Sequence, residues 1–326
     1  MCKSRGFQIM AFSIKNLQNI PEYDMIFEEQ RKERANMKHY RIGDLNITLD
    51  PGPIEIHDDL LTEGFLTSGA EMGPSLSIRC QMANLSFLRD WEIELYTGAY
   101  EIRRNGEQRF MLHHWMTHRY AFGLYLDQLF KRGSVCLCCN EEISEPIRMT
   151  AAQLLGAAGL HHHLLQEGCG VLHASYISHK EKGILFAAPS RTGKTTQAEL
   201  WREHAGAEIL NGDRALVFCR DGIWYGGGYI ACGSSGICRN ESYPLCAIVF
   251  LEQGKDNMVR SATGKERVHG LITGMETYHW SVEDMDLAFS LASRIGAEIP
   301  ILHFSCRPDR DAVYSLEQYL EALSQC

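Results

Sequence analysis

The first clear pattern in the chain is a series of short segments, starting after residue 37, in which apolar and polar residues alternate. Segment 40–50 alternates in this way and is followed by Pro-Gly-Pro at 51–53, and similar segments follow at 75–81, 91–104, 107–114 and 134–142. A period of two residues is typical of strands with one buried face. Asn105-Gly106 favours a hairpin between two of these segments. The pattern predicts a mostly antiparallel β domain over residues 38–150.

The pattern changes at Thr150. Residues 150–168 predict a helix with Thr150 as its N-cap, and its apolar side comprises Leu154, Leu155, Ala158, Leu164 and Leu165. Apolar strands then alternate with helices: 171–177, 183–188, a helix from about 194, 207–211, 215–219 and 245–252. Such alternation is typical of an α/β layer with a central sheet. The continuous apolar run at 245–252 predicts a strand buried on both faces.

The first 37 residues differ from both of these regions. Segment 24–37 has good helix formers and mixed charges but few apolar positions, which favours a solvated helix or a disordered arm. The sequence therefore predicts an arm at 1–37, a mostly β domain at 38–150 and a second domain at 151–326.

Composition and charge narrow the function classes. The 326 residues are 45% hydrophobic and 22% charged, with a net charge of −9, which excludes a largely disordered chain and gives no basic footprint for nucleic acid. No apolar run reaches the length of a membrane span, and no secretory signal is visible. We therefore expect a cytoplasmic protein that binds no nucleic acid or membrane and whose 12 cysteines are mostly reduced. Homo-oligomerisation stays open.

One segment carries a strong signature for phosphate binding. Residues 188–195 read Ala-Pro-Ser-Arg-Thr-Gly-Lys-Thr, which fits the loop G-x-x-x-x-G-K-[ST] with Ala in place of the first Gly. Backbone N–H groups of such a loop cradle phosphates, its Lys reaches the β- and γ-phosphates, and its last Thr offers a hydroxyl to Mg²⁺. We expect ATP and Mg²⁺ as ligands; the alternative is an ordinary strand–turn–helix. The expected nucleotide-binding residues are Ser190, Arg191, Thr192, Gly193, Lys194, Thr195 and Thr196.

Two other residues are candidates for the chemistry. Asp213 follows the predicted strand 207–211, a position where P-loop enzymes hold Mg²⁺ or orient a nucleophile. We expect Asp213 and Thr195 to bind the metal ion, and Asp213 also to take part in catalysis. The alternative is that Asn-Gly-Asp forms a simple turn, in which this sequence is common. His173 lies on the strand before the loop strand. Its ring reaches the phosphates if these two strands are neighbours, and it is otherwise a core histidine.

Three segments together resemble a known family. VLHASYI (171–177), GILFAAPSRTGKTTQAELW (183–201) and ILNGDRALVF (209–218) resemble the HPr kinase type of serine kinase. These kinases share a P-loop fold with phosphoenolpyruvate carboxykinases. The fit is closer to HPr-kinase-related proteins of modified-peptide gene clusters. The resemblance covers about residues 170–326 and implies an α/β P-loop domain of the HPr kinase/phosphoenolpyruvate carboxykinase type after the β domain.

The resemblance also assigns roles residue by residue. His173 matches the family's histidine, Ser190 the loop serine, and Asp213 the second position of a paired Asp motif. Ala188 and Arg191 stand where the family prefers Gly, and Gly212 stands where HPr kinase has its first Asp. The Arg-Gly signature tied to HPr recognition is not evident, which disfavours HPr as the acceptor.

Three more segments contain chemically interesting side chains. The glycine-rich segment 225–240 predicts a flexible loop that closes over the ligand, with Arg239 as a candidate catalytic residue that neutralises transition-state charge; a surface loop with a solvated Arg239 is the alternative. Cys136, Cys138 and Cys139 lack a second pair for zinc, which favours buried strand cysteines. Consecutive helical histidines 161–163 diverge by about 100° each, which favours solvated or cap-proximal side chains.

The sequence as a whole favours a Mg·ATP-dependent kinase. It would transfer the γ-phosphoryl group to a hydroxyl, with a serine of a peptide or small protein as the expected acceptor and a small-molecule alcohol as the alternative. In that function Asp213, His173, Lys194 and Arg239 are the expected catalytic residues. Two hypotheses compete with it: a catalytically silent nucleotide-binding regulator or peptide-binding module, and a metal-dependent scaffold built on the cysteine cluster.

Overall fold

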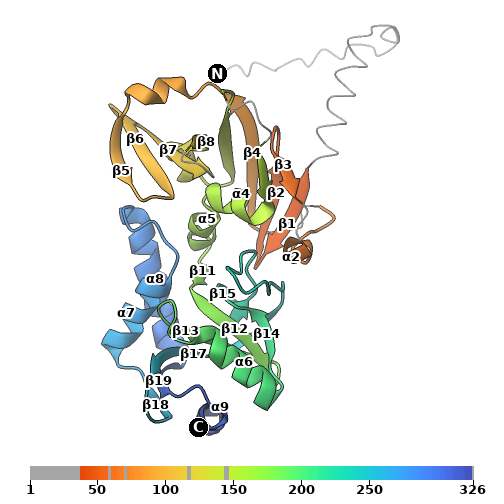
Figure 1. Cartoon of the computed structure of the whole chain (residues 1–326), viewed down its shortest axis with the longest axis vertical. Coiled ribbons are helices and arrows are strands. Elements are labelled where there is room, and N and C mark those ends of the chain that lie inside the picture. The colour runs from red at the N-terminus through yellow and green to blue at the C-terminus, as the bar shows by residue number, and fades with distance from the viewer. Residues whose placement is uncertain (1–36, 58–59, 70–71, 116–118, 143–146, 325–326) are drawn as a thin grey trace, which may run out of the picture. The chain divides into compact units, whose positions relative to one another are not determined.

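Two large sheets organise the chain after residue 37 (Figure 1). The computed structural model describes residues 37–57, 60–69, 72–115, 119–142 and 147–324, and residues from Lys38 onward form one compact unit. The arm expected at 1–37 lies outside the described residues, apart from Met37. The described residues make a mixed α/β fold, as the sequence predicted.

The first sheet has eight strands in the order β1-β2-β4-β9-β8-β7-β6-β5. Its pairs are antiparallel except β2–β4 and β4–β9, which are parallel, so the expectation of a mostly antiparallel sheet is confirmed. The strands are β1 (Lys38–Ile42), β2 (Leu45–Asp50), β4 (Ser75–Ala83), β5 (Glu92–Tyr96), β6 (Tyr100–Asn105), β7 (Gln108–Trp115), β8 (Arg119–Tyr125) and β9 (Ser134–Asn140).

Local turn chemistry explains the hairpins of this sheet. The hairpin expected at Asn105-Gly106 is confirmed, because Asn105 pairs with Gln108 across a two-residue turn. Segment 40–50, expected as one strand, is instead the hairpin of β1 and β2, in which Ile42 pairs with Leu45. Short elements complete this region: α2 (Leu60–Glu63), η1 (Ser86–Asp90), α3 (Leu126–Leu129) and a small sheet of β3 (Glu55–His57) with β10 (Arg148–Thr150).

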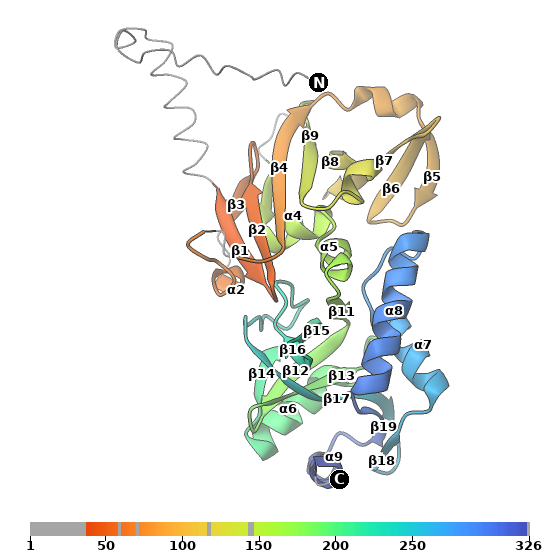
Figure 2. The same ribbon diagram turned by 180° about the vertical axis from the view of Figure 1, so that it is seen from behind.

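Two short helices connect the two large sheets. Thr150 caps helix α4 (Ala151–Ala157) with a complete capping box, as its sequence position predicted. The single helix expected over 150–168 is wrong, because Gly159 adopts the left-handed conformation and separates α4 from α5 (Leu160–Gln166). Both views place α4 and α5 between the first sheet and strand β11 (Gly170–Leu172) (Figures 1 and 2).

The second sheet has nine strands, and the loop of residues 188–193 directly follows one of them. Its order is β11-β15-β16-β17-β13-β12-β14, with β19 paired to β17 and β18 to β19. The strands are β11 (Gly170–Leu172), β12 (Ala174–His179), β13 (Lys182–Ala187), β14 (Glu208–Asn211), β15 (Ala215–Arg220), β16 (Ile223–Gly227), β17 (Ser242–Gln253), β18 (Met258–Ser261) and β19 (Ile301–Cys306).

Helices cover both faces of this sheet. Helices α6 (Lys194–Ala205) and α9 (Arg310–Ser324) pack on one face, and α7 (Gly264–Gly274) and α8 (Val282–Glu298) on the other. Strand β17 alternates between the two cores, since Ile248 joins the α7/α8 side and Val249 the α6/α9 side. The expectation that run 245–252 is buried on both faces is therefore confirmed for its central residues.

The two large sheets share part of their hydrophobic core. One cluster of buried side chains includes Ile78 of the first sheet, Leu155 of α4 and Phe218 of the second sheet. Arg220 donates to Asp44 at 2.6 Å, and the Trp280 indole donates to the Tyr100 hydroxyl at 2.9 Å. Within the described part of the chain, no helix combines the length and apolar character needed to cross a membrane.

Candidate functional site

Three strand ends meet at one edge of the second sheet. Strand β13 is central, and β12 lies antiparallel between it and β14. The register pairs Ala174 with Ala187, and Tyr176 with Asn211. The start of β12 therefore lies beside the ends of β13 and β14. This arrangement brings His173, the loop after Ala187 and Asp213 to the same edge, although 40 positions separate the first from the last.

An interruption between two consecutive strands places His173 at this edge. The segment 171–177, expected as one strand, is two strands: β11 pairs with β15, and β12 pairs with β13. His173 stands between them, and its backbone N–H donates to Gly274 O at 2.7 Å. Its side chain is 32% exposed. It is therefore not the core histidine of the alternative interpretation.

The loop of residues 188–193 joins β13 to helix α6, in the strand–loop–helix order that the sequence predicted. The first N–H groups of any helix have no acceptor within the helix. In α6 the N-cap is Gly193, so no capping side chain supplies one. Arg191, which stands where the resembled family prefers Gly, has φ +66°. A left-handed conformation strains a non-glycine residue by about 1–2 kcal/mol, which explains that family preference.

A pocket of about 450 Å³ lies over this loop. It brings together most of the residues that the sequence singled out. Its lining comprises His173, Ser190, Arg191, Gly193, Lys194, Thr195, Thr196, Gly212, Asp213, Ser234 and Ser235. Of the residues expected to bind nucleotide, Thr192 lies in the loop but does not line the pocket.

A continuous series of polar contacts runs through the pocket. The Lys194 ammonium donates to His173 Nε2 at 3.0 Å and to Ala188 O at 2.9 Å. His173 Nδ1 lies 3.3 Å from Asp213 Oδ1, and Arg214 donates to Asp213 Oδ2 at 2.6 Å. Arg214 also donates to Glu276. Because an ammonium group only donates, His173 Nε2 is the acceptor, and the ring proton is on Nδ1, towards Asp213.

Burial changes the titration of this series. It lowers the pKa of the Lys194 ammonium, and the nearby Asp213 carboxylate partly opposes that effect. Burial also lowers the pKa of His173, and the Lys194 charge lowers it further. His173 is therefore neutral at neutral pH, in agreement with its role as the acceptor from Lys194.

The turn that holds Asp213 is fixed by Asn211, whose role the sequence analysis did not identify. Fully buried Asn211 accepts from the N–H groups of Asp213 and Arg214 at 3.0 and 2.9 Å. Its amide donates to Tyr229 O and Ala231 O at 2.9 and 3.1 Å. The Asn-Gly-Asp turn of the alternative interpretation is thus present, and it positions Asp213 in the pocket.

The same contacts change the expected picture of the glycine-rich segment 225–240. The segment was expected to be a flexible loop, but Gly226 and Gly227 belong to β16, and Asn211 bonds to the following residues. A Cβ at Gly212 would lie 2.3 Å from Cβ of Ser235. The segment therefore packs directly on the position where HPr kinase has its first Asp, which leaves no room for a carboxylate there.

Arg239 lies outside the residues that line the pocket. It donates to Glu208 at 2.9 Å and is 51% exposed. The guanidinium that contacts Asp213 is that of Arg214. The only signal for this contact in the sequence is that Arg214 directly follows Asp213. Glu276, its partner, is 62 positions away in the chain, and no motif marks it.

The other two clusters lie apart from this pocket. The cysteines of β9 are partly or fully buried, as the sequence favoured, and burial raises the pKa of the Cys139 thiol to about 12, which disfavours a thiolate ligand. Among the described residues, no three His, Cys, Asp or Glu side chains gather as a metal site. The histidines of 161–163 were expected to be solvated or cap-proximal. The solvated alternative is wrong for His162 and His163, which are buried, while His163 does lie in the last turn of α5. His162 Nδ1 lies 2.6 Å from an oxygen of Asp284, which is 122 positions away in the chain.

Comparisons with known proteins give little beyond the geometry. No protein-family model matches the chain, and no curated protein sequence does. Among solved structures, the chain is similar to the HPr(Ser) kinase/phosphatase from Coxiella burnetii, with a TM-score of 0.30 and 11% sequence identity. The similarity covers 48% of this chain and 99% of that chain. A similarity with a TM-score this low carries no conclusion about function.

Proposed function

We propose that the protein is a Mg·ATP-dependent kinase that phosphorylates an alcohol hydroxyl. One observation carries the proposal: Lys194, His173 and Asp213, from three separate segments, meet in a pocket bounded by the N-terminus of helix α6. A hydroxyl of a peptide or small protein, or of a small alcohol, is the acceptor. The resemblance of the loop to phosphate-binding loops gives independent support from the sequence.

The residues of the pocket fit a nucleotide with its metal ion. Helix α6 presents N–H groups without a capping side chain, a favourable environment for phosphate oxygens. Thr195 and Asp213 line the same pocket and supply oxygen atoms of the kind that Mg²⁺ prefers. Since Mg²⁺ usually takes only one or two carboxylates plus substrate phosphates, a single Asp suffices. Bound Mg²⁺ would neutralise charge on the phosphate oxygens.

The chain's own groups have distinct roles in the transfer. Lys194 stabilises negative charge on the transferred group, and His173 holds the Lys194 ammonium in position through Nε2. Asp213 orients the acceptor hydroxyl and takes its proton. The hydroxyl oxygen forms a bond to the γ-phosphorus while the bond to the β–γ bridging oxygen breaks. The products are a phosphate monoester and ADP, and the proton leaves from Asp213 to solvent.

One contact favours the competing function, a nucleotide-binding protein without transfer activity. Arg214 donates to Asp213 Oδ2 at 2.6 Å, and a carboxylate oxygen engaged by a guanidinium is less available to an acceptor hydroxyl. The two functions differ in turnover. A kinase forms ADP in proportion to acceptor, whereas a silent regulator binds Mg·ATP and forms none.

The first test removes the charge of Lys194. In Lys194→Ala we expect the affinity for Mg·ATP to fall about 10- to 100-fold, because a charged hydrogen bond contributes about 1.5–3 kcal/mol. Titration calorimetry measures the affinity. Lys182→Ala is the matched control, because Lys182 is exposed at the opposite end of β13. If calorimetry detects no binding of Mg·ATP to the folded wild-type protein, the proposed function is wrong.

A further inference from the structure

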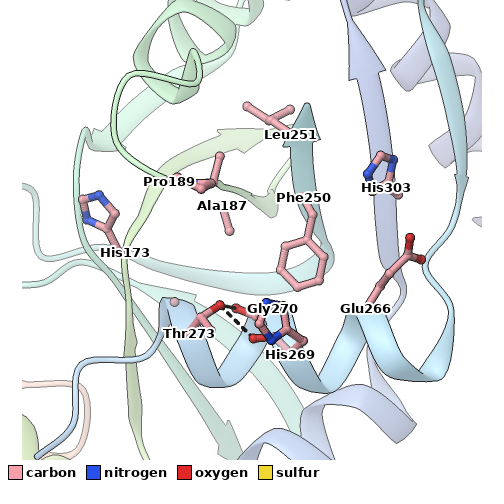
Figure 3. A pocket seen from close by; sticks show the side chains of 12 residues that line it. His173, Ala187, Pro189, Phe250, Leu251, Glu266, His269, Gly270, Thr273 and His303 are labelled. Atoms are coloured by element: carbon pink, nitrogen blue, oxygen red, sulfur yellow. Dashed lines mark hydrogen bonds between the residues drawn. The ribbon is translucent and has the colours of Figure 1, made fainter. Parts of the chain in front are cut away.

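A second cavity, of about 400 Å³, lies on the other side of the loop's first residues. Figure 3 shows its walls: Phe250 from β17 faces helix α7 at His269 and Gly270, and His173 lies at the far end beside Pro189. Its volume is in the range of small-ligand sites. It is separate from the pocket over the loop except for His173, which lines both.

The contacts of Lys194 fix the position of this cavity relative to the reacting phosphate. The ammonium group bonds to His173 Nε2, Ala188 O and Pro189 O at 3.0, 2.9 and 3.4 Å. All three of these residues line the second cavity. Because the Lys of a phosphate-binding loop reaches the β- and γ-phosphates, the cavity opens beside the γ-phosphoryl end of the nucleotide. That is where an acceptor must lie.

The lining of the cavity is mostly apolar, and two of its polar side chains, Glu266 and Thr273, already have partners. Glu266 accepts two hydrogen bonds from Arg260, at 2.8 and 2.6 Å, and one from the backbone of Thr263. The Thr273 hydroxyl donates to the carbonyl of His269 within its own helix at 2.8 Å. The apolar part of the lining includes the Phe250 ring and Ala187, which suits an apolar body.

We infer that this cavity holds the apolar body of the phosphoryl acceptor and directs its hydroxyl towards Lys194 and His173. This inference rests on the proposed kinase function. The acceptor class is then a hydroxyl attached to an aromatic or branched aliphatic group. Two sources share that chemistry: a serine next to a large apolar residue, and a small apolar alcohol. The acceptor oxygen bonds to the γ-phosphorus, the bond to the ADP oxygen breaks, and the hydroxyl proton passes to Asp213.

Helix α7 offers a matched pair of variants for the test. A Cβ at Gly270 would lie 2.4 Å from the nearest atom of the Phe250 ring, whereas a Cβ at Gly264 in the same helix meets nothing within 4 Å. Gly270→Ala is therefore expected to push the Phe250 ring into the cavity, whereas Gly264→Ala leaves both the ring and the cavity unchanged. Thr273→Leu is a second filling variant at an exposed position, which avoids strain in the fold.

The experiment measures ADP formation at saturating Mg·ATP with three probes: N-acetyl-seryl-phenylalanine amide, N-acetyl-seryl-glycine amide and 2-phenylethanol. We expect the first or the third to react with a KM at least about 10-fold below that of the glycine peptide. Gly270→Ala and Thr273→Leu should raise that KM about 10-fold, with Gly264→Ala unchanged. Reaction of the peptide alone identifies a peptide acceptor, and reaction of the alcohol alone a small-molecule acceptor.

Ligand-observed NMR with 2-phenylethanol and both peptides gives a readout that does not need ATP. Apolar probes should bind wild type and Gly264→Ala but not Gly270→Ala. If Mg·ATP binds but no apolar probe binds or reacts, or if the filling variants leave KM unchanged, the acceptor cavity is refuted while nucleotide binding stands. Probes that bind without being phosphorylated also refute the acceptor role. Absence of Mg·ATP binding instead refutes the proposed function.

Discussion

At the scale of single residues, the candidate site is a series of four charged or polar contacts. Lys194, His173, Asp213, Arg214 and Glu276 are joined in that order. The contact with Lys194 requires His173 Nε2 to be the acceptor, which places the ring proton on Nδ1, facing Asp213. The chemistry of any one residue therefore depends on the next.

Asp213 is expected to matter for the reaction and little for stability. Asp213→Asn keeps an oxygen for the Arg214 hydrogen bond, so we expect the melting temperature to stay close to wild type. Phosphoryl transfer should fall at least ~10²-fold, the scale for losing a positioned base. ADP formation with acceptor measures this. Asp221→Asn, at an exposed turn position, is the control, and near-normal turnover in Asp213→Asn would leave only the turn role for Asp213.

His173 is expected to act on the rate through Lys194. His173→Ala removes the acceptor of the ammonium group, and the demand for a well-placed charge is greatest in the transition state. We therefore expect the transfer rate to fall more than the affinity for ATP, with little change in melting temperature because the ring is partly exposed. Both quantities are measured on the same variant. A lower melting temperature with normal specific activity would make His173 a packing residue.

At the scale of elements, the site depends on where strands end. Strands β12, β13 and β14 bring three loops together at one edge of the sheet, and Asn211 ties the end of β14 to the segment after β16. This segment then contacts Asp213 directly. A Cβ at Gly233 would lie 2.7 Å from Asp213 Oδ2.

Two glycines of this segment provide a test of that contact. Gly233 and Gly236 both have positive φ, of +55° and +67°, but a Cβ at Gly236 meets nothing within 4 Å. Alanine strains the backbone at either position by about 1–2 kcal/mol, so both variants should lose similar stability. Only Gly233→Ala should displace the Asp213 carboxylate and lower phosphoryl transfer, by about 10-fold or more. Equal activities of the two variants would show that the contact does not position Asp213.

At the scale of the whole molecule, the two large sheets depend on a shared core. The cluster that contains Ile78, Leu155 and Phe218 extends from the first sheet through α4 and α5 to the second. Asn240 adds hydrogen bonds to the backbone of Arg41 and Gly64, at 3.2 and 3.1 Å. The division of residues 38–326 into two domains at residue 150 stays a prediction from the sequence.

This packing predicts one cooperative unfolding transition for residues 38–326. Calorimetry should show a single peak, with the calorimetric enthalpy equal to the van't Hoff enthalpy. Mg·ATP should move the whole peak to higher temperature, because a ligand that binds only the folded state stabilises everything that unfolds with its site. Two peaks, of which Mg·ATP moves only one, would show instead that the two sheets unfold separately.

The sequence alone determined the features that depend on neighbours along the chain. The strand–loop–helix around Gly193, the hairpin at Asn105-Gly106, the capping box at Thr150 and the two-sided burial of β17 follow from local turn chemistry, capping and periodicity. Candidate residues His173, Lys194 and Asp213 were found by their positions relative to these elements. The same local patterns do not mark where one element ends and the next begins. The hairpin of β1 and β2 and the separation of α4 from α5 were therefore not predicted.

Only the tertiary structure decided which distant groups meet. Strand order places His173 between Lys194 and Asp213, pairs Arg214 with Glu276, and leaves Arg239 with Glu208 outside the pocket. The same is true of buried His162 with Asp284, and of the cavity between β17 and α7. These contacts join segments far apart in the chain, and periodicity and motifs give no information on the register and packing that bring such segments together.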